Sequence, residues 1–258
     1  MEVIGELESV TGQIATSPKS PHMLVTADIG KFINVYSVED FRLLATYTTS
    51  EDCSGDIDDI KLSPDGSLCV IRKYKKGGLV VLDIRDVSAI FESARAGEED
   101  GPFEAMDIHR DNERLVTFGD TIKIWSATTG ELLNDFDVFD EFGVDLKFLY
   151  DPDRVLYVDD DRVKIMDMNG TALLTLNSAI NPIFCLINPI RGGQEVITAE
   201  IDDSIRFHDT HTGEVLYTFV EHRSTKFMHF IVTEDANTIV GFNRNGLSYV
   251  LKNSTDHF

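Results

Sequence analysis

Short runs of alternating apolar and polar residues recur along the chain. A lysine separates Ile122 from Ile124, and an arginine separates Ile205 from Phe207 in the same way. A period of two places the apolar side chains on one face of a β-strand, whereas an amphipathic helix requires a period near 3.6. Sustained helical periodicity is absent from the sequence, so the pattern predicts an all-β protein.

The alternating runs belong to a repeat. Six segments share a turn residue, an alternating run, a break and a second apolar pair, and they begin at Lys31, Gly77, Asp120, Asp161, Asp203 and Asn245. Their sixth residues are Tyr36, Leu82, Trp125, Met166, His208 and Val250. Successive sixth residues lie 41 to 46 positions apart, which is the length of one four-stranded propeller blade. The repeat therefore predicts a β-propeller of about six blades, each of four antiparallel strands.

Turn-forming sequences punctuate the repeats where hairpins are needed. Those expected between the first and second strands are Ser63–Gly66, Arg110–Glu113, Tyr150–Asp153, Arg191–Gln194 and Glu234–Asn237. Those expected between the third and fourth strands are Thr129–Gly130, Asn169–Gly170 and Thr212–Gly213. The polar stretch from Ser93 to Pro102 is expected to form a long loop.

The repeats resemble those of the WD40 family, whose blades carry a D-x-[IVL]-[RK]-[IVF]-W-D sequence. The segment from Asp120 to Ser126, DTIKIWS, is the best match, and those from Asp203 and Asp161 are similar. The resemblance covers nearly the whole chain and implies a scaffold or adaptor that binds other proteins. The chain departs from the family in two ways: it has one tryptophan, and it lacks the Gly-His pair of a standard blade. The nearest remnant of that pair is Glu221-His222. We therefore expect the family's buried Asp-His-Ser-Trp hydrogen-bond chain to be incomplete in every blade.

The last repeat ends near the chain terminus without a clear fourth strand. The segment Val3–Leu7 is a spare strand, and in propellers of this kind an N-terminal strand often completes the last blade. We favour a single domain over residues 1–258 that closes in this way, because an unpaired edge strand invites pairing with other chains. The alternatives are an open ring that takes a seventh blade from a partner, and a fragment of a longer protein.

The chain is strongly acidic, with a formal net charge of −22. Such a charge opposes direct binding to nucleic acid or anionic membranes and favours basic protein partners in a hetero-complex. The alternative is that the acidity only keeps the protein soluble. Acidic residues gather in the loops expected at the narrower face of the propeller, some of them as residues that cap their own turns. The candidates for partner binding are Glu98, Glu99, Asp140, Glu141, Asp159, Asp160 and Asp202.

Sequence patterns for catalysis or cofactor binding are missing. The chain contains no G-x-S-x-G, phosphate-binding loop or H-E-x-x-H, and the three scattered cysteines indicate an intracellular protein of the cytoplasm or nucleus. Two sets of residues are candidate metal ligands, namely His208 with His211 and the run Asp159–Asp161. We favour a packing role for His208 and a solvated-loop role for the aspartates. We expect no enzyme activity, cofactor or metal. The alternative is a metal-dependent hydrolase or lactonase with acids in a central channel, around Asp58, Asp107, Asp145, Asn181 and Lys226.

Overall fold

The computed structural model describes fifteen segments of the chain, and every structural statement below concerns them. They are residues 12–17, 20–28, 31–50, 56–73, 78–93, 104–138, 143–150, 153–159, 162–176, 182–187, 193–200, 204–220, 227–232, 238–243 and 248–252. The chain forms two compact units, Met1–Val138 and Phe139–Phe258. All regular structure in the described segments is β-strand, as the alternating pattern predicts.

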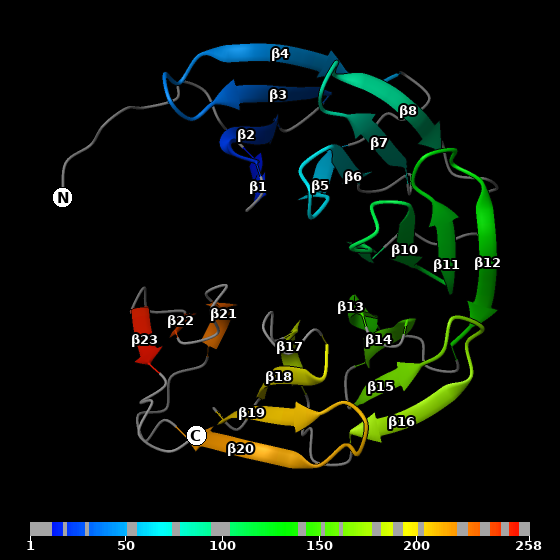
Figure 1. Ribbon diagram of the computed structural model, residues 1–258, viewed down its shortest axis with the longest axis vertical. Coiled ribbons are helices and arrows are strands. Elements are labelled where there is room, and N and C mark those ends of the chain that lie inside the picture. Colours follow the sequence, from blue (N-terminus) through cyan, green and yellow to red (C-terminus); the bar gives the residue numbers. More distant parts are fainter. Residues whose placement is uncertain are drawn as a thin grey trace. The chain divides into compact units, whose positions relative to one another are not determined.

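The first unit contains three sheets of four antiparallel strands, each built from consecutive strands (Figure 1). Sheet 1 contains β1 (Gly12–Ser17), β2 (Ser20–Asp28), β3 (Phe32–Ser37) and β4 (Leu43–Thr48). Sheet 2 contains β5 (Ile57–Leu62), β6 (Leu68–Lys73), β7 (Leu79–Asp83) and β8 (Ser88–Ser93). Sheet 3 contains β9 (Ala105–Ile108), β10 (Arg114–Phe118), β11 (Thr121–Ser126) and β12 (Leu132–Asp137).

The second unit repeats the same sheet. Sheet 4 contains β13 (Gly143–Tyr150), β14 (Asp153–Asp159), β15 (Val163–Met166) and β16 (Ala172–Leu176). Sheet 5 contains β17 (Pro182–Ile187), β18 (Glu195–Glu200), β19 (Ser204–Asp209) and β20 (Val215–Val220). Sheet 6 has three strands in the described segments, β21 (Phe227–Val232), β22 (Thr238–Asn243) and β23 (Ser248–Lys252). The expected closing strand, Val3–Leu7, lies outside the described residues.

The predicted turns join the predicted strands wherever the structure describes them. Ser63–Gly66 and Arg110–Glu113 connect first and second strands, and Tyr150 pairs directly with Asp153. Thr129–Gly130, Asn169–Gly170 and Thr212–Gly213 connect third and fourth strands. The glycines of these last three turns have φ between 74° and 83°, a left-handed conformation that glycine adopts without steric strain. Residues 191, 192 and 234–237, and the loop residues 94–102, lie outside the described segments.

A β-bulge recurs at one position of all five four-stranded sheets. Trp125 pairs with Leu132 while Ile124 pairs with Asn134, so Leu133 is the extra residue of β12. The corresponding extra residues of the five sheets are Leu44, Ile90, Leu133, Leu173 and Leu216. Each bulge lies opposite the sixth residue of a repeat, so the sequence repeat is also a repeat of backbone geometry. A bulge twists an edge strand and disfavours pairing with another chain.

Within each unit, the core lies between successive sheets. In sheet 2, Ile71 and Leu82 pack with residues of sheet 1, whereas Val70 and Val81 belong to the cluster that contains Trp125 of sheet 3. Both faces of sheet 2 are therefore buried, which explains why its second and third strands are nearly continuous apolar runs. Val70, Ile71, Val81 and Leu82 are all fully buried.

Successive sheets within a unit place their first strands side by side. β5 contacts both β1 and β9 in the first unit, and β17 contacts both β13 and β21 in the second. Polar contacts follow the same neighbours: Ser17 Oγ donates to the Pro64 carbonyl oxygen (3.1 Å), and Lys61 Nζ donates to that of Met106 (2.6 Å). These pairs are separated by 47 and 45 residues, close to the repeat length. The arrangement within each unit is compatible with a propeller-like fold.

Candidate functional site

The indole of Trp125 makes a buried hydrogen bond in sheet 3. Its Nε1–H donates to the Thr117 hydroxyl oxygen at 2.9 Å, and Thr117 is fully buried. Trp125 on β11 pairs with Leu115, so Thr117 lies two residues further along β10. This hydrogen bond therefore joins the second and third strands of sheet 3.

His208 occupies the same position in sheet 5 and makes the same kind of bond. It pairs with Val196, and Thr198 lies two residues further along β18. The Thr198 hydroxyl lies 3.0 Å from Glu200 Oε1, to which it donates, and 2.9 Å from His208 Nε2. A hydroxyl has one proton to donate, so His208 Nε2 must carry the hydrogen in its own bond to Thr198. The imidazole thus replaces the indole N–H of Trp125.

The environment of His208 disfavours its charged form. His208 is fully buried, and Glu200 beside it is 2% exposed and ion-paired with Arg206. Burial, and after it the charge of Arg206, lowers the pKa of His208 from 6.5 to about 4. A neutral, hydrogen-bonded histidine in this position holds two strands of one sheet together, and its packing against a neighbouring blade stays a prediction.

The turn after His208 has a structural role of its own. Asp209 Oδ1 accepts hydrogen bonds from the backbone N–H groups of His211 and Thr212, both at 2.8 Å. Within the described segments, no group of three or more His, Cys, Asp or Glu side chains could hold a metal ion.

The threonine partners were not singled out from the sequence, although a signal for them exists. Leu115-Val-Thr117 and Val196-Ile-Thr198 are matched in sheet 1 by Leu24-Val-Thr26, whose threonine is 2% exposed. A threonine therefore recurs on the second strand, two residues beyond the partner of the repeat's sixth residue, and in sheets 3 and 5 its hydroxyl binds a ring nitrogen of that sixth residue.

The acids proposed to line a central channel are each close to a cation. Asp58 pairs with Arg72 at 2.6 Å in the first unit, where Asp107 lies 3.5 Å from Lys61. In the second unit, Asp145 pairs with Lys147 at 2.9 Å. Asn181 and Lys226 lie outside the described residues. The three described carboxylates are thus engaged by cations, which weakens them as ligands for a catalytic metal.

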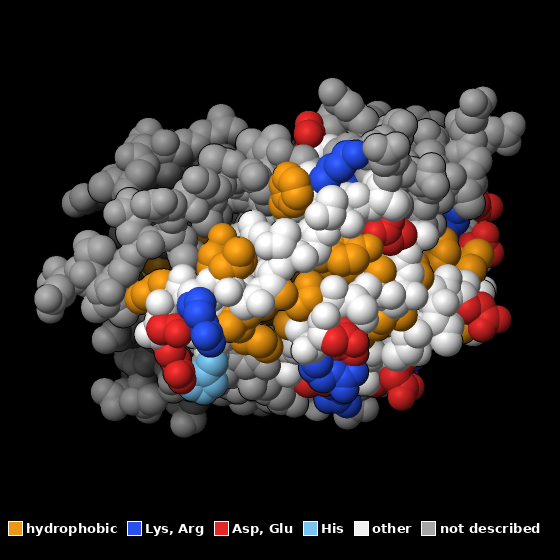
Figure 2. Space-filling view, turned by 90° about the horizontal axis from the view of Figure 1, so that it is seen from above, with side chains coloured by type: hydrophobic (Ala, Val, Ile, Leu, Met, Phe, Trp, Pro, Cys, Tyr) orange, Lys and Arg blue, Asp and Glu red, His pale blue; other side chains and the backbone are white. Residues whose placement is uncertain are grey.

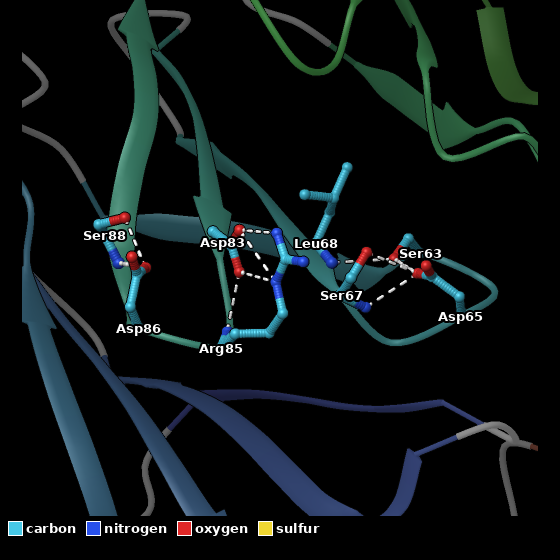
Figure 3. A network of polar contacts seen from close by, with 8 residues as sticks. All are labelled: Ser63, Asp65, Ser67, Leu68, Asp83, Arg85, Asp86 and Ser88. Carbon is cyan, nitrogen blue, oxygen red and sulfur yellow. Dashed lines mark hydrogen bonds and ion pairs between the residues drawn. The ribbon is translucent and has the colours of Figure 1, made fainter.

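The hairpin turns of sheet 2 contain a second polar network (Figure 3). Asp65 Oδ1 accepts hydrogen bonds from the hydroxyl of Ser63 (2.7 Å) and from the backbone N–H of Ser67 (2.9 Å). Burial would raise the pKa of Asp65, but the hydrogen bonds from Ser67 and Ser63 outweigh it, and the pKa is lowered. The contacts cap the β5–β6 turn and are structural.

The neighbouring β7–β8 turn is closed by its own residues (Figure 3). The Arg85 guanidinium binds the Asp83 carboxylate, with Nε 2.8 Å from Oδ1, and this hydrogen bond lowers the pKa of Asp83. Asp86 Oδ1 accepts hydrogen bonds from the hydroxyl (2.6 Å) and the backbone N–H (3.1 Å) of Ser88. These acids are therefore occupied within their own turn.

One of the seven acidic candidates for partner binding can be placed. Asp159 ends β14, is 5% exposed, accepts a hydrogen bond from the backbone N–H of Arg162 (2.6 Å) and lies 3.3 Å from Lys164 Nζ. This geometry is that of a residue capping its own turn. Glu98, Glu99, Asp140, Glu141, Asp160 and Asp202 lie outside the described residues, and their role in binding stays a prediction.

The exposed apolar side chains concentrate on fourth strands, which the sequence reasoning did not consider. Among the described residues they include Leu43, Leu44, Leu132, Leu133, Leu173, Leu216, Tyr217 and Phe219. Figure 2 shows one face of the molecule on which hydrophobic side chains lie between charged ones. Apolar side chains on an outer strand are a surface that another protein can cover.

Comparison with models of known protein families and with curated protein sequences found no match for this chain. In the described segments, no helix is long and apolar enough to cross a membrane.

Proposed function

We propose that this protein is a non-catalytic scaffold or adaptor subunit, built as a WD40-like β-propeller of about six blades, that binds other proteins in a larger complex. The observation that carries the proposal is the repetition of one bulged sheet whose buried polar groups bind one another. Those groups, such as Thr117 with Trp125 and Thr198 with His208, hold strands together. The outer strands present apolar side chains, as a binding platform requires.

Charge argues for the chemistry of the partner. At a net charge of −22, the protein attracts basic proteins over distances of about one Debye length, roughly 8 Å at physiological salt. The loop acids at Glu98, Glu99, Asp140 and Glu141 are the proposed contacts. Replacing these four residues by lysine should weaken partner binding and reduce its dependence on salt. Unchanged affinity and salt dependence would refute the acidic-face hypothesis.

The scaffold proposal is tested by purifying the tagged protein gently from its native cell and identifying the proteins that remain at low and high salt. We expect stoichiometric partners, with basic ones leaving as salt rises. Recovery of the chain alone, together with a stoichiometric metal in elemental analysis, would overturn the proposal in favour of the channel hydrolase.

A further inference from the structure

The outer strand of sheet 3 combines exposed apolar side chains with an excess of acidic residues. Leu132 and Leu133 on β12 are 44% and 51% exposed. Glu131, Asp135 and Asp137, which precede and follow them, are also exposed. The hairpin over residues 120–138 contains four acidic residues and one lysine, Lys123.

The matching strand of sheet 1 supplies an internal comparison. β4 has the same bulge, and its leucines Leu43 and Leu44 are 48% and 45% exposed. Its hairpin, residues 31–50, has two acidic and two basic residues and is therefore neutral. The apolar pair thus recurs in both sheets, whereas an excess of negative charge accompanies it in the hairpin of sheet 3 and not in that of sheet 1.

We propose that β12 docks an extended, basic segment of a partner protein that has lysine or arginine at alternate positions beside an apolar pair. Side chains two residues apart on a strand lie on the same face, so Asp135 and Asp137 form a row that alternate cations of an extended segment can match. Leu132 and Leu133 would bury the apolar pair. The bulge at Leu133 disfavours a continuous backbone ladder, so recognition rests on these side chains.

This inference rests on the proposed scaffold function and identifies one surface and partner chemistry for it. The proposed surface is strand β12. The loop acids Glu98, Glu99, Asp140 and Glu141 are a separate proposal, and they lie outside the described segments. The electrostatic and apolar contributions to the binding free energy can be measured separately, because salt screens the electrostatic attraction and not the apolar contact.

The test uses a fluorescein-labelled peptide in which two lysines at alternate positions precede a Leu-Leu pair. Fluorescence anisotropy with the full chain should show binding that weakens about tenfold in Asp135→Lys/Asp137→Lys, mainly at low salt. It should weaken about tenfold in Leu132→Ser/Leu133→Ser at all salt concentrations, the apolar surface of two leucines being lost. The matched control, Leu43→Ser/Leu44→Ser, should bind as the unmodified protein does, and a peptide with glutamate for lysine should not bind.

Equal affinity in all four proteins, or photo-crosslinks of the peptide outside residues 131–137, would overturn the inference. All substituted side chains are exposed, and urea unfolding confirms that each variant is folded. The charge variant and the apolar variant test the inference independently. If one of them does not fold, the peptide affinity of the other still decides the question. If both β12 variants retain all native partners on purification, this inference is wrong and the proposed scaffold function still holds. If the unmodified chain purifies alone yet binds the peptide, the scaffold function is wrong.

Discussion

Acidification should destabilise the second unit through His208. The pKa of His208 is about 4 in the folded protein and 6.5 when unperturbed, because the folded protein buries the imidazole. The unfolded chain therefore binds a proton more readily than the folded one. His208 leaves stability intact above pH 6.5 and lowers it as the pH falls from 6.5 towards 4, with no further loss below.

The size of the effect follows from the difference between the two pKa values. The free energy of unfolding should fall by about 1.4 kcal/mol per pH unit within this window, to a limit of about 3 kcal/mol. Urea unfolding at a series of pH values measures it. The variant His208→Gln keeps an N–H donor for Thr198 and cannot titrate, so its stability should depend less on pH between 6.5 and 4.

The exposed His211→Gln is the matched control, because it removes a nearby histidine without touching the buried bond. Its pH profile should follow that of the unmodified protein. Parallel profiles for the unmodified protein and His208→Gln would refute the reasoning, since they would show that the buried imidazole is not a destabilising proton acceptor.

Two further predictions concern the first unit and the repeated turns. Trp125→Phe should lower the free energy of unfolding by about 1–3 kcal/mol in urea titrations, because it removes the donor to Thr117 and leaves space in the core; no loss of stability would contradict the role of this bond. Gly130→Ala should destabilise the protein more than Gly213→Ala in thermal melts. Both glycines have φ near 75°, but a Cβ at Gly130 would lie 2.6 Å from Phe91 Cγ, whereas one at Gly213 would meet the flexible end of a leucine at 3.3 Å. Equal melting temperatures would refute this comparison.

Much of the local architecture could be predicted because it depends on short-range chemistry. The alternation around Ile122 and Ile124 defines strand faces, and the turns at Thr129–Gly130 and Thr212–Gly213 define where the chain reverses. The period of 41–46 residues predicted sheets of equal size, and the five four-stranded sheets confirm this part of the prediction. The exposure of the leucines of β12 was not predicted. An apolar pair in a strand is assigned to the core until the positions of the neighbouring sheets are known.

The candidate sites were harder to predict for the same reason. Asp58, Asp107 and Asp145 look alike in the sequence as acids near the start of first strands. Their cations, Arg72, Lys61 and Lys147, are assigned only when strand register and sheet stacking are known. A carboxylate proposed as a metal ligand thereby becomes half of an ion pair.

The sequence by itself determined the class of secondary structure, the repeat length and the acidic character of this protein, because each depends on residue type and spacing alone. Only the tertiary structure decided that His208 acts as a neutral N–H donor in the place of tryptophan, and that Asp159 is nearly buried and caps its own turn. The physical reason is that a side chain's charge state and partners depend on burial and on atoms brought close by register, bulges and the stacking of sheets. Those quantities join residues far apart in the chain, and no local pattern contains them.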